Sequence, residues 1–403
     1  MHKHHSALGL AKALRPAEPV TCLRPHAARK AARYFVEKFP GMTMYAVKAN
    51  PSPELIRVLW DSGITMFDVA SLAEVRLVRG LLPEAVLCFM HPVKAPEAIS
   101  EAYFTHGVRV FSLDSHDELD KIMAVTADEN GEAATDLTLC VRLRVSSAHA
   151  KLSLAAKFGA TMDEAPGLLQ AARQAADALG VCFHVGSQTM SAQAYADAMQ
   201  TVRAAIVAAA VTVDVVDVGG GFPSVYPGMS PAPLDGYFGV IGRMFEALPI
   251  SYSAELWCEP GRALCAEYAS VVARVERRKS DVLYINDGAY GSLFDAAHVD
   301  WRFPVALLRE QPSYAKTIGF SLYGPTCDDM DFMKGPFDLP ADVAAGDYIE
   351  FGMLGAYGAA MRTQFNGFGV GETAELGDEP MATLYGEAEP DVEMPANVVA
   401  LRK

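Results

Sequence analysis

Between residues 44 and 262, eight short apolar runs alternate with amphipathic stretches, and this alternation constrains the fold more than any other feature of the sequence. The apolar runs are nearly continuous, which is typical of parallel strands that are covered on both faces. We expect strands at 44–48, 65–69, 85–90, 108–113, 137–145, 183–187, 213–218 and 254–259. We expect helices at 26–38, 53–62, 72–80, 96–106, 116–125, 164–179, 192–210 and 235–248.

Eight strand–helix units in roughly 220 to 240 residues fit a closed (β/α)8 TIM-type barrel better than an open doubly wound sheet. After residue 262 the pattern changes to strands with few helices between them. These strands are expected at 271–277, 282–285, 316–322, 347–351 and 372–376, with a short run at 19–23 joining them. We therefore predict an α/β barrel over residues 24–263 and a mainly β domain, of the sandwich or barrel type, over residues 264–403 together with 1–23.

Charge and cysteine usage exclude several classes of function. The formal net charge of −15 argues against nucleic acid and anionic membrane as partners. No apolar run is long enough to span a bilayer, and the N-terminus lacks the apolar core of a secretory signal. The seven cysteines are scattered and form no CxxC pair, which favours a reducing, cytoplasmic compartment. We predict no metal site, and we interpret His2, His4 and His5 as part of a solvated terminus.

Polar residues recur at the ends of the predicted barrel strands, where barrels of this type gather their functional side chains. Lys48 ends the first strand, and the functional interpretation depends on it. Taken alone, this lysine is more simply explained as a strand-edge residue with its charged head in water. The other strand ends and the turns after them carry Asp68, Glu74, Arg142, Arg144, His184, Ser187, Asp217, Glu259 and Arg262.

The loops after the seventh and eighth strands look like a phosphate site. Three successive glycines at 219–221 let backbone N–H groups approach an anion, although alone they would predict only a tight turn. Arg262 can add a bidentate contact and Ser187 a hydroxyl, in the loops where this architecture often binds phosphate. A phosphate site near a strand-end lysine indicates pyridoxal 5′-phosphate held through a Schiff base, with Glu259 keeping the pyridine nitrogen protonated.

Seven motifs in one consistent order carry a resemblance: YAVKAN, FDVAS, HVGSQ, DVGGGFP, CEPGR, YGPTCDDMD and LGAYGAAMRTQFNGF. From about residue 20 to 370 the chain resembles the barrel-plus-β-domain pyridoxal-phosphate decarboxylases that act on ornithine, diaminopimelate and arginine. The resemblance implies that Lys48 is the Schiff-base lysine, that His184 stacks on the ring, and that Glu259 is the pyridinium partner. It implies further cofactor-binding and supporting positions at Asp68, Glu74, Arg144, Ser187, Gly219, Gly220, Gly221, Gly261, Arg262 and Tyr357.

The resemblance also implies a homodimer with shared active sites, in which Cys327 and Asp328 reach into the partner's site. Cys327 would deliver a proton, which a thiol with an ordinary pKa of ~8.5 can do near neutrality. Asp328, Asp295 and Tyr290 would bind the substrate. Without the resemblance, a Cys-Asp pair is more often a loop thiol beside a solvated acid.

Acidic residues at the substrate's far end suit a distal ammonium group, so the implied reaction is decarboxylation of a basic L-amino acid, best matched by L-ornithine giving putrescine. Diaminopimelate decarboxylases usually show Cys-Glu in place of Cys327-Asp328 and a serine in place of Ala263. Biosynthetic arginine decarboxylases are expected to be considerably longer. Lysine differs from ornithine by one methylene, worth only ~1–3 kcal/mol of discrimination. A lysine/ornithine enzyme and a diaminopimelate decarboxylase therefore stay open as alternatives.

Two functions from other classes share this fold. An amino-acid racemase would be expected to pair the pyridine nitrogen with a cationic residue, and Glu259 argues against it. A non-catalytic regulatory homologue would not need to keep Lys48, His184, Glu259 and Cys327 together. The sequence therefore favours an enzyme.

Overall fold

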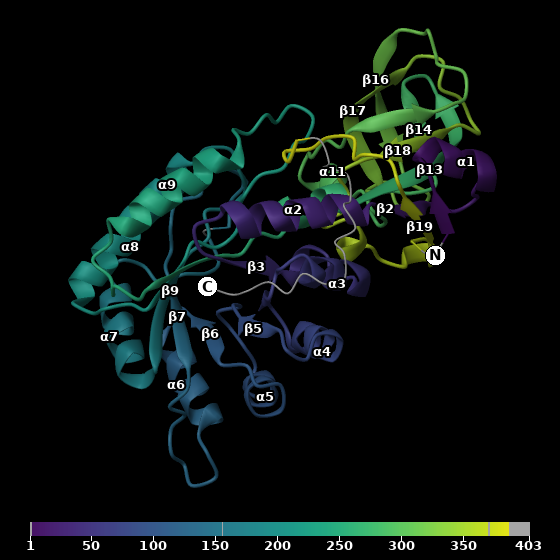
Figure 1. Ribbon diagram of the computed structural model, residues 1–403. Helices are drawn as coiled ribbons and strands as arrows, with labels where there is room; N and C mark the ends of the chain where they lie inside the picture. Colours follow the sequence, from purple (N-terminus) through teal and green to yellow (C-terminus); the bar gives the residue numbers. More distant parts are fainter. Residues whose placement is uncertain (1, 155, 370, 387–403) are drawn as a thin grey trace, which may run out of the picture.

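The computed structural model describes residues 2–154, 156–369 and 371–386, and the acidic stretch from residue 387 lies outside them. Figure 1 shows a barrel surrounded by helices, with a β-rich domain at one end. Eight parallel strands close the barrel in the order β11-β12-β3-β4-β5-β6-β7-β9, which confirms the predicted TIM-type fold. They are β3 (Met42–Ala46), β4 (Met66–Val69), β5 (Val86–Phe89), β6 (Val110–Leu113), β7 (Thr138–Arg142), β9 (Ala178–Cys182), β11 (Val215–Asp217) and β12 (Glu255–Cys258).

The helices between these strands begin where the sequence signals a helix start. Proline occupies the first turn of α2, α3 and α5, where its fixed φ suits the helix and its missing N–H costs nothing. The Ser71 and Ser115 side chains accept hydrogen bonds from the N–H groups of Glu74 and Glu118 at the starts of α4 and α6. The barrel helices are α2 (Pro25–Lys38), α3 (Pro53–Asp61), α4 (Leu72–Leu81), α5 (Pro96–Ser100), α6 (His116–Thr126), α7 (Ala165–Ala175), α8 (Gln193–Ala209), α9 (Leu234–Glu246) and α10 (Arg262–Cys265).

The sixth barrel strand lies earlier than the sequence predicts. We expected residues 183–187, but β9 ends at residue 182 and the preceding helix stops at residue 175. The strand begins with Ala178 directly after the alanine-rich end of α7, so its sequence was interpreted as a continuation of that helix. Gly180 is needed there because a Cβ would lie 2.5 Å from the Cys140 sulfur of the neighbouring strand. The chain beyond β9 instead forms β10 (Ser187–Thr189), which pairs with β8 (Ala150–Leu152) outside the barrel.

The β domain is built around the long strand β13 (Ala269–Lys279), which pairs with β2 (Val20–Leu23), β14 (Val282–Ile285) and β18 (Tyr348–Phe351). Each strand predicted after residue 262, and the run at 19–23, overlaps a strand of this sheet. The remaining strands are β1 (His2–His4), β15 (Val305–Leu308), β16 (Thr317–Tyr323), β17 (Phe332–Pro340) and β19 (Glu372–Leu376).

The sequence did not predict β1, β15 or β17. Residues 2–4 pair in parallel with β19 and lead into α1 (Ala7–Leu14), so this end is not frayed, although His2 and His5 are exposed to solvent as expected. In β17 buried and exposed residues alternate, but the Gly335–Pro336 pair in its middle reads as a turn. The predicted domain boundary, with the barrel at residues 24–263 and the β domain in the rest of the chain, stays a prediction.

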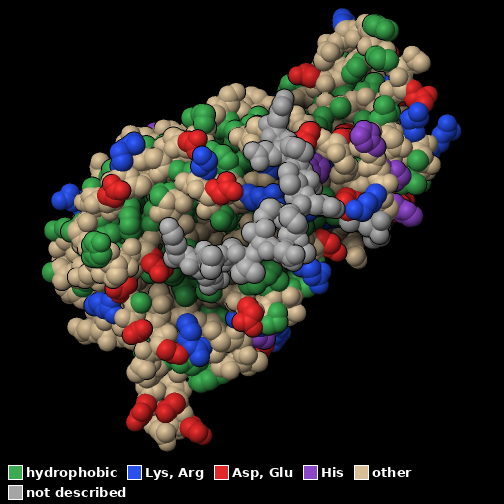
Figure 2. Space-filling model, in the orientation of Figure 1, with side chains coloured by type: hydrophobic (Ala, Val, Ile, Leu, Met, Phe, Trp, Pro, Cys, Tyr) green, Lys and Arg blue, Asp and Glu red, His purple; other side chains and the backbone are tan. Residues whose placement is uncertain are grey.

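The β domain meets the barrel at the C-terminal ends of the barrel strands. There the backbone N–H of Tyr357 donates to the Ala49 carbonyl, with an N–O distance of 2.8 Å. Within the described ranges, no helix is both long and apolar enough to cross a membrane. Acidic and basic side chains are interspersed on the face of the molecule shown in Figure 2.

Candidate active site

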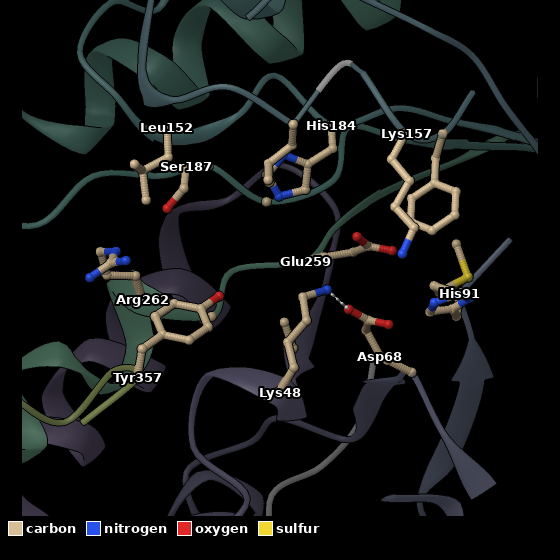
Figure 3. A pocket seen from close by; sticks show the side chains of 18 of the residues that line it. Lys48, Asp68, His91, Leu152, Lys157, His184, Ser187, Glu259, Arg262 and Tyr357 are labelled. Carbon is tan, nitrogen blue, oxygen red and sulfur yellow. Dashed lines mark hydrogen bonds and ion pairs between the residues drawn. The ribbon is translucent and has the colours of Figure 1, made fainter. Parts of the chain in front are cut away.

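A cavity of about 500 Å³ opens at the C-terminal ends of the barrel strands. Its walls come from the ends of β3, β4 and β7, the turns after β9, β11 and β12, and the segment of the β domain that carries Tyr357. Figure 3 shows side chains from these elements pointing into one space. Most predicted cofactor-binding residues line it: Lys48, Asp68, His184, Ser187, Gly220, Gly221, Glu259, Gly261, Arg262 and Tyr357.

Lys48 follows β3 in a short 3₁₀ turn and forms an ion pair with Asp68 at the end of β4. The Lys48 Nζ lies 2.8 Å from the Asp68 Oδ2, drawn as a dashed line in Figure 3. Burial alone would lower the pKa of Lys48, but the carboxylates of Asp68 and Glu259 raise it above that of a free lysine. The strand-edge explanation therefore fails, because the ammonium group faces buried carboxylates in the cavity.

Glu259 and Asp217 form a buried carboxyl pair at the ends of the neighbouring strands β12 and β11. Burial and the adjacent Asp217 raise the pKa of Glu259 well above its usual range. Burial also raises the pKa of Asp217 to about 6, although its Oδ1 accepts the Gly219 N–H at 2.9 Å. Both carboxyls therefore hold a proton more readily than a free carboxylic acid does, and Glu259 presents such a group toward the cavity.

The glycine run after β11 lets backbone and side chains approach closely beside His184. A Cβ at Gly220 would lie 2.7 Å from the Glu259 carbonyl oxygen and 3.1 Å from the His184 Nε2. Gly221 has a φ of +100°, a conformation that side chains rarely adopt. The His184 Nδ1 accepts the Gly186 N–H at 3.0 Å, and burial lowers the pKa of the ring well below its usual value. A neutral imidazole therefore forms one wall of the cavity.

Arg262 lies in an aromatic cage at one end of the cavity. Its guanidinium carbon is 4.5 Å from the centre of the Trp301 ring and 4.9 Å from that of Tyr357. The Nη1 donates to the Tyr226 hydroxyl at 3.2 Å, and the Nη2 lies 3.6 Å from the Asp295 Oδ2. The Nε is buried and has no partner among the described residues. A buried donor left unpaired beside the cavity indicates an anionic occupant.

These features fit pyridoxal phosphate. In Figure 3, Ser187, Arg262 and Tyr357 gather at one end of the cavity, while Lys48 and Glu259 lie toward its centre. The first group can bind a phosphate, and its unpaired guanidinium N–H needs such an acceptor. The second group offers an amine for an aldehyde and a protonated carboxyl for a ring nitrogen. The donor set therefore matches both ends of one cofactor.

Arg144 is a wrong prediction, because its side chain is exposed and does not line the cavity. Arg142, two residues earlier, lines the cavity instead. The expected strand ran to residue 145 and so included both arginines, but β7 ends at Arg142. Gly219 and Glu74 also lie outside the lining. The Glu74 Oε2 accepts the Ala70 N–H at 2.6 Å and so supports the turn after β4.

The predicted substrate-binding residues divide into two groups. Asp295 lines the cavity beside Arg262. Tyr290, Cys327 and Asp328 lie together on the β domain, outside the cavity of their own chain. The Tyr290 hydroxyl donates to Asp328, and the exposed Cys327 thiol lies 3.5 Å from the Asn366 Oδ1. One chain therefore does not bring its own substrate-binding residues to one place.

Three residues that line the cavity could not be singled out from the sequence: His91, Lys157 and Phe158. His91 packs edge-on against Phe158 at 5.1 Å, and the Lys157 Nζ lies 4.8 Å from the centre of the same ring. Burial and the neighbouring cations lower the pKa of His91. These residues come from loops with no regular period, and only a strand-end position could have indicated His91, which follows β5 by two residues.

Comparison with known proteins gives consistent matches. Residues 26–266 match the family model described as pyridoxal-dependent decarboxylase, pyridoxal binding domain. The chain is 31% identical over 368 residues to a lysine/ornithine decarboxylase of Selenomonas ruminantium, a match that covers 88% of each chain.

Two solved structures extend these matches to the whole fold. The lysine/ornithine decarboxylase of Vibrio vulnificus in complex with putrescine is 29% identical, with a TM-score of 0.77, over 93% of this chain and 99% of that one. The arginine decarboxylase of Paramecium bursaria Chlorella virus bound to agmatine is 26% identical, with a TM-score of 0.79, over 91% and 98%. Because this arginine enzyme matches nearly end to end, chain length does not separate arginine from the other substrates.

Proposed function

The chain belongs to the pyridoxal-dependent decarboxylase family, and from this premise we propose that its substrate is L-ornithine and its product putrescine. The relatives described above are decarboxylases of lysine, ornithine or arginine, which supports decarboxylation of a basic amino acid. The observation that supports the proposal is the Lys48–Asp68 ion pair in the same cavity as Glu259 and the unpaired Arg262 N–H.

Each residue around the cavity has a role that follows from its surroundings. Bound pyridoxal phosphate supplies an electron-withdrawing ring that accepts the electron pair left when carbon dioxide departs. Lys48 would hold the cofactor through its Nζ, and Asp68 would keep a proton on that nitrogen whenever it is free. Glu259, whose pKa is raised by burial, would hold the proton at the ring nitrogen. His184 is neutral and would pack on the ring without adding charge.

The choice of ornithine depends on the acids at the far end of the substrate. Asp328 is a partly exposed carboxylate whose pKa is lowered by the Tyr290 hydroxyl that donates to it, so it is ionised near neutral pH. Such a group suits a distal ammonium. Asp295 lies 3.6 Å from the Arg262 Nη2, so its charge is partly balanced already. Asp328 is therefore the stronger determinant of the two.

We propose that a second copy of the chain completes the site. Tyr290, Cys327 and Asp328 gather on the β domain and do not line the candidate active site of their own chain, as expected of groups that enter a partner's site. There Cys327 would deliver a proton to the α-carbon of the product, and Asp328 would bind the distal ammonium. The proposed unit is a homodimer with two shared sites.

The deciding experiment is a competition assay for carbon dioxide release from ornithine, lysine, arginine and meso-diaminopimelate. We expect the highest kcat/KM with ornithine and, because one methylene is worth ~1–3 kcal/mol, a roughly 10- to 200-fold lower value with lysine. Equal values would make the enzyme a lysine/ornithine decarboxylase. A preference for arginine or meso-diaminopimelate would refute the role given to Asp328, and the Lys48→Ala variant serves as the blank.

A further inference from the structure

A second cavity, of about 450 Å³, lies where the barrel meets the β domain. Two segments, 46–52 and 354–362, contribute lining residues to this cavity and to the candidate active site. Lys48 and Tyr357 face the active site, whereas Arg362 faces the second cavity. Nothing in the proposed reaction uses this second cavity, although the two spaces share walls.

Three side chains around the second cavity carry buried polar atoms that have no hydrogen-bond partner in the described part of the chain. They are the Ser52 hydroxyl, the Tyr268 hydroxyl and the Nε of Arg362. Tyr268 is only 1% exposed. The Arg362 Nη2 donates to the hydroxyls of Thr21, at 3.1 Å, and Ser292. Its Nε donates to no described residue. A buried polar group without a partner is costly, so three around one polar cavity indicate an occupant that accepts hydrogen bonds.

The first turn of α3 opens on the same cavity. Ser52 is the N-cap of this nine-residue helix, but its side chain makes no capping bond to the first turn. Its carbonyl accepts the Ile56 N–H at 3.1 Å, which leaves the earlier N–H groups of the turn to other partners. The positive end of the helix therefore adds to the three side-chain donors.

The cavity also has a negative group. Glu54 is exposed and lines the same space. Burial raises the pKa of Tyr268 most, and the negative charge of Glu54 raises it further. An inorganic anion would meet Glu54 as a like charge. A dipolar ligand would satisfy both sides, with an acid at Arg362 and Tyr268 and an ammonium at Glu54.

We propose that this cavity binds the carboxylate of a free amino acid, outside the catalytic site. The carboxylate accepts hydrogen bonds from Arg362, Tyr268 and Ser52, and the ammonium group faces Glu54. Occupancy stabilises the segment 46–52, which carries the cofactor lysine. The proposal does not depend on which substrate the active site takes.

The test measures binding to the cofactor-loaded protein by isothermal titration calorimetry, with three probes. N,N-dimethylglycine carries a carboxylate and an ammonium but, as a tertiary amine, cannot bond to the cofactor's aldehyde. Acetate carries the carboxylate alone, and inorganic phosphate is a different oxyanion. We expect N,N-dimethylglycine to bind more tightly than acetate, and Glu54→Gln to remove that difference.

Tyr268→Phe is the informative variant, because it removes a hydroxyl that lies near Ser52 and makes no hydrogen bond within the geometric limits to any described residue. We expect the unliganded variant to unfold at the same or a higher temperature, and its affinity for N,N-dimethylglycine to fall by about tenfold or more. Ser52→Ala should act in the same direction, and Arg362→Met should abolish binding. Arg277→Met, which changes an exposed arginine on β13, is the matched control and should bind normally.

Three outcomes would overturn the proposal. Absence of binding for every probe would mean that water alone fills the cavity. Binding that is unchanged in Tyr268→Phe would place the probe elsewhere, including the active site, which Tyr268 does not line. Phosphate that binds while N,N-dimethylglycine does not would exclude an amino acid as the occupant.

Discussion

The two ends of the candidate active site differ in how completely one chain builds them. At the cofactor end, Lys48, Asp68 and Glu259 lie in one cavity and come from adjacent barrel strands, and the Lys48 Nζ lies 2.8 Å from the Asp68 Oδ2. At the substrate end, Cys327 and Asp328 lie on an outer loop of the β domain, away from that cavity.

This difference separates the groups that the fold of one chain brings together from those that we propose a second copy of the chain supplies. Parallel strands bring their C-terminal ends together whatever the partner does, so the cofactor groups are preorganised in the single chain. The loop at residues 325–331 carries Cys327 and Asp328 outside the cavity of its own chain. Substitutions at the cofactor end should therefore act within one subunit, and substitutions at the substrate end should act across the interface.

The largest effect is expected for Lys48→Ala. Loss of this amine should remove both the covalent hold on the cofactor and a proton-transferring group, lowering turnover by at least on the order of 10²–10⁴-fold. The variant should also lack the visible absorbance band of lysine-bound cofactor. Lys279→Ala, at the exposed end of β13, is the control. Appreciable decarboxylation by Lys48→Ala would remove the basis of the proposed cofactor end.

A smaller effect, split between two kinetic constants, is expected at the substrate end. Cys327→Ala should mainly lower kcat, by roughly 10²-fold or more, because it removes a proton donor. Asp328→Asn should mainly raise KM, by roughly 10- to 100-fold, because it removes the charge opposite a distal ammonium. Steady-state kinetics with ornithine separate the two. Identical effects of both changes on kcat alone would contradict the division of roles.

Mixing two inactive variants tests the interface directly. Lys48→Ala fails at the cofactor end and Cys327→Ala at the substrate end, so a mixed dimer of these chains has one intact site. Random exchange at equal concentrations should restore about a quarter of the wild-type sites. A mixture that stays inactive, while subunit exchange is demonstrated by differently tagged chains, would refute shared sites and place both ends in one chain.

The same contrast explains how much could be predicted from the sequence. Eight apolar runs were enough for the barrel, and the strand-end rule placed Lys48, Asp68, Glu259 and Arg262 together, because strand order alone determines which ends meet. The sixth strand was misplaced because ALGVC continues an alanine-rich helix pattern and only its packing against Cys140 makes it a strand.

Side chains beyond strand ends were harder to predict. Arg144 was chosen from the family resemblance, and the local pattern does not separate it from Arg142, two residues earlier. The end of β7 at Arg142 and the lining of the cavity show which of the two reaches the site. His91 and Lys157 come from loops, where position depends on contacts far apart in the sequence. The second cavity was not predicted at all, because its donors come from α3, β13 and residue 362, which no local pattern connects.

A pH experiment tests whether a buried acid behind the cofactor end affects the stability of the folded chain. Glu267, next to α10, is buried, and burial raises its pKa to about 7. Between its usual pKa of ~4.5 and 7 the folded state keeps a proton that the unfolded chain releases, so stability should fall as pH rises through this window. The upper limit of this effect is about 3 kcal/mol.

Glu267→Gln should flatten the pH dependence of the unfolding midpoint, whereas Glu372→Gln, at an exposed position, should not. A slope equal to that of the wild type would exclude Glu267 as its cause.

The smallest expected effect concerns the described end of the C-terminal segment. The Tyr385 hydroxyl donates to the carbonyl of Ala263, which adjoins Arg262, and the Tyr385 ring packs edge-on against Tyr34 at 5.3 Å. Tyr385→Phe leaves the ring in place but removes this donor, which is worth ~0.5–1.5 kcal/mol. Affinity for pyridoxal phosphate should therefore fall by a few-fold to about tenfold in a titration of cofactor-free protein.

The KM for substrate decides what such a loss means. If the cofactor end is assembled within one chain, loosening α10 should weaken cofactor binding while KM, measured at saturating cofactor, stays as in the wild type. Tyr314→Phe, at an exposed position on the β domain, is the control for a lost tyrosine hydroxyl. A rise in KM with unchanged cofactor affinity would instead connect the C-terminal segment to the substrate end, and the two ends would no longer be independent.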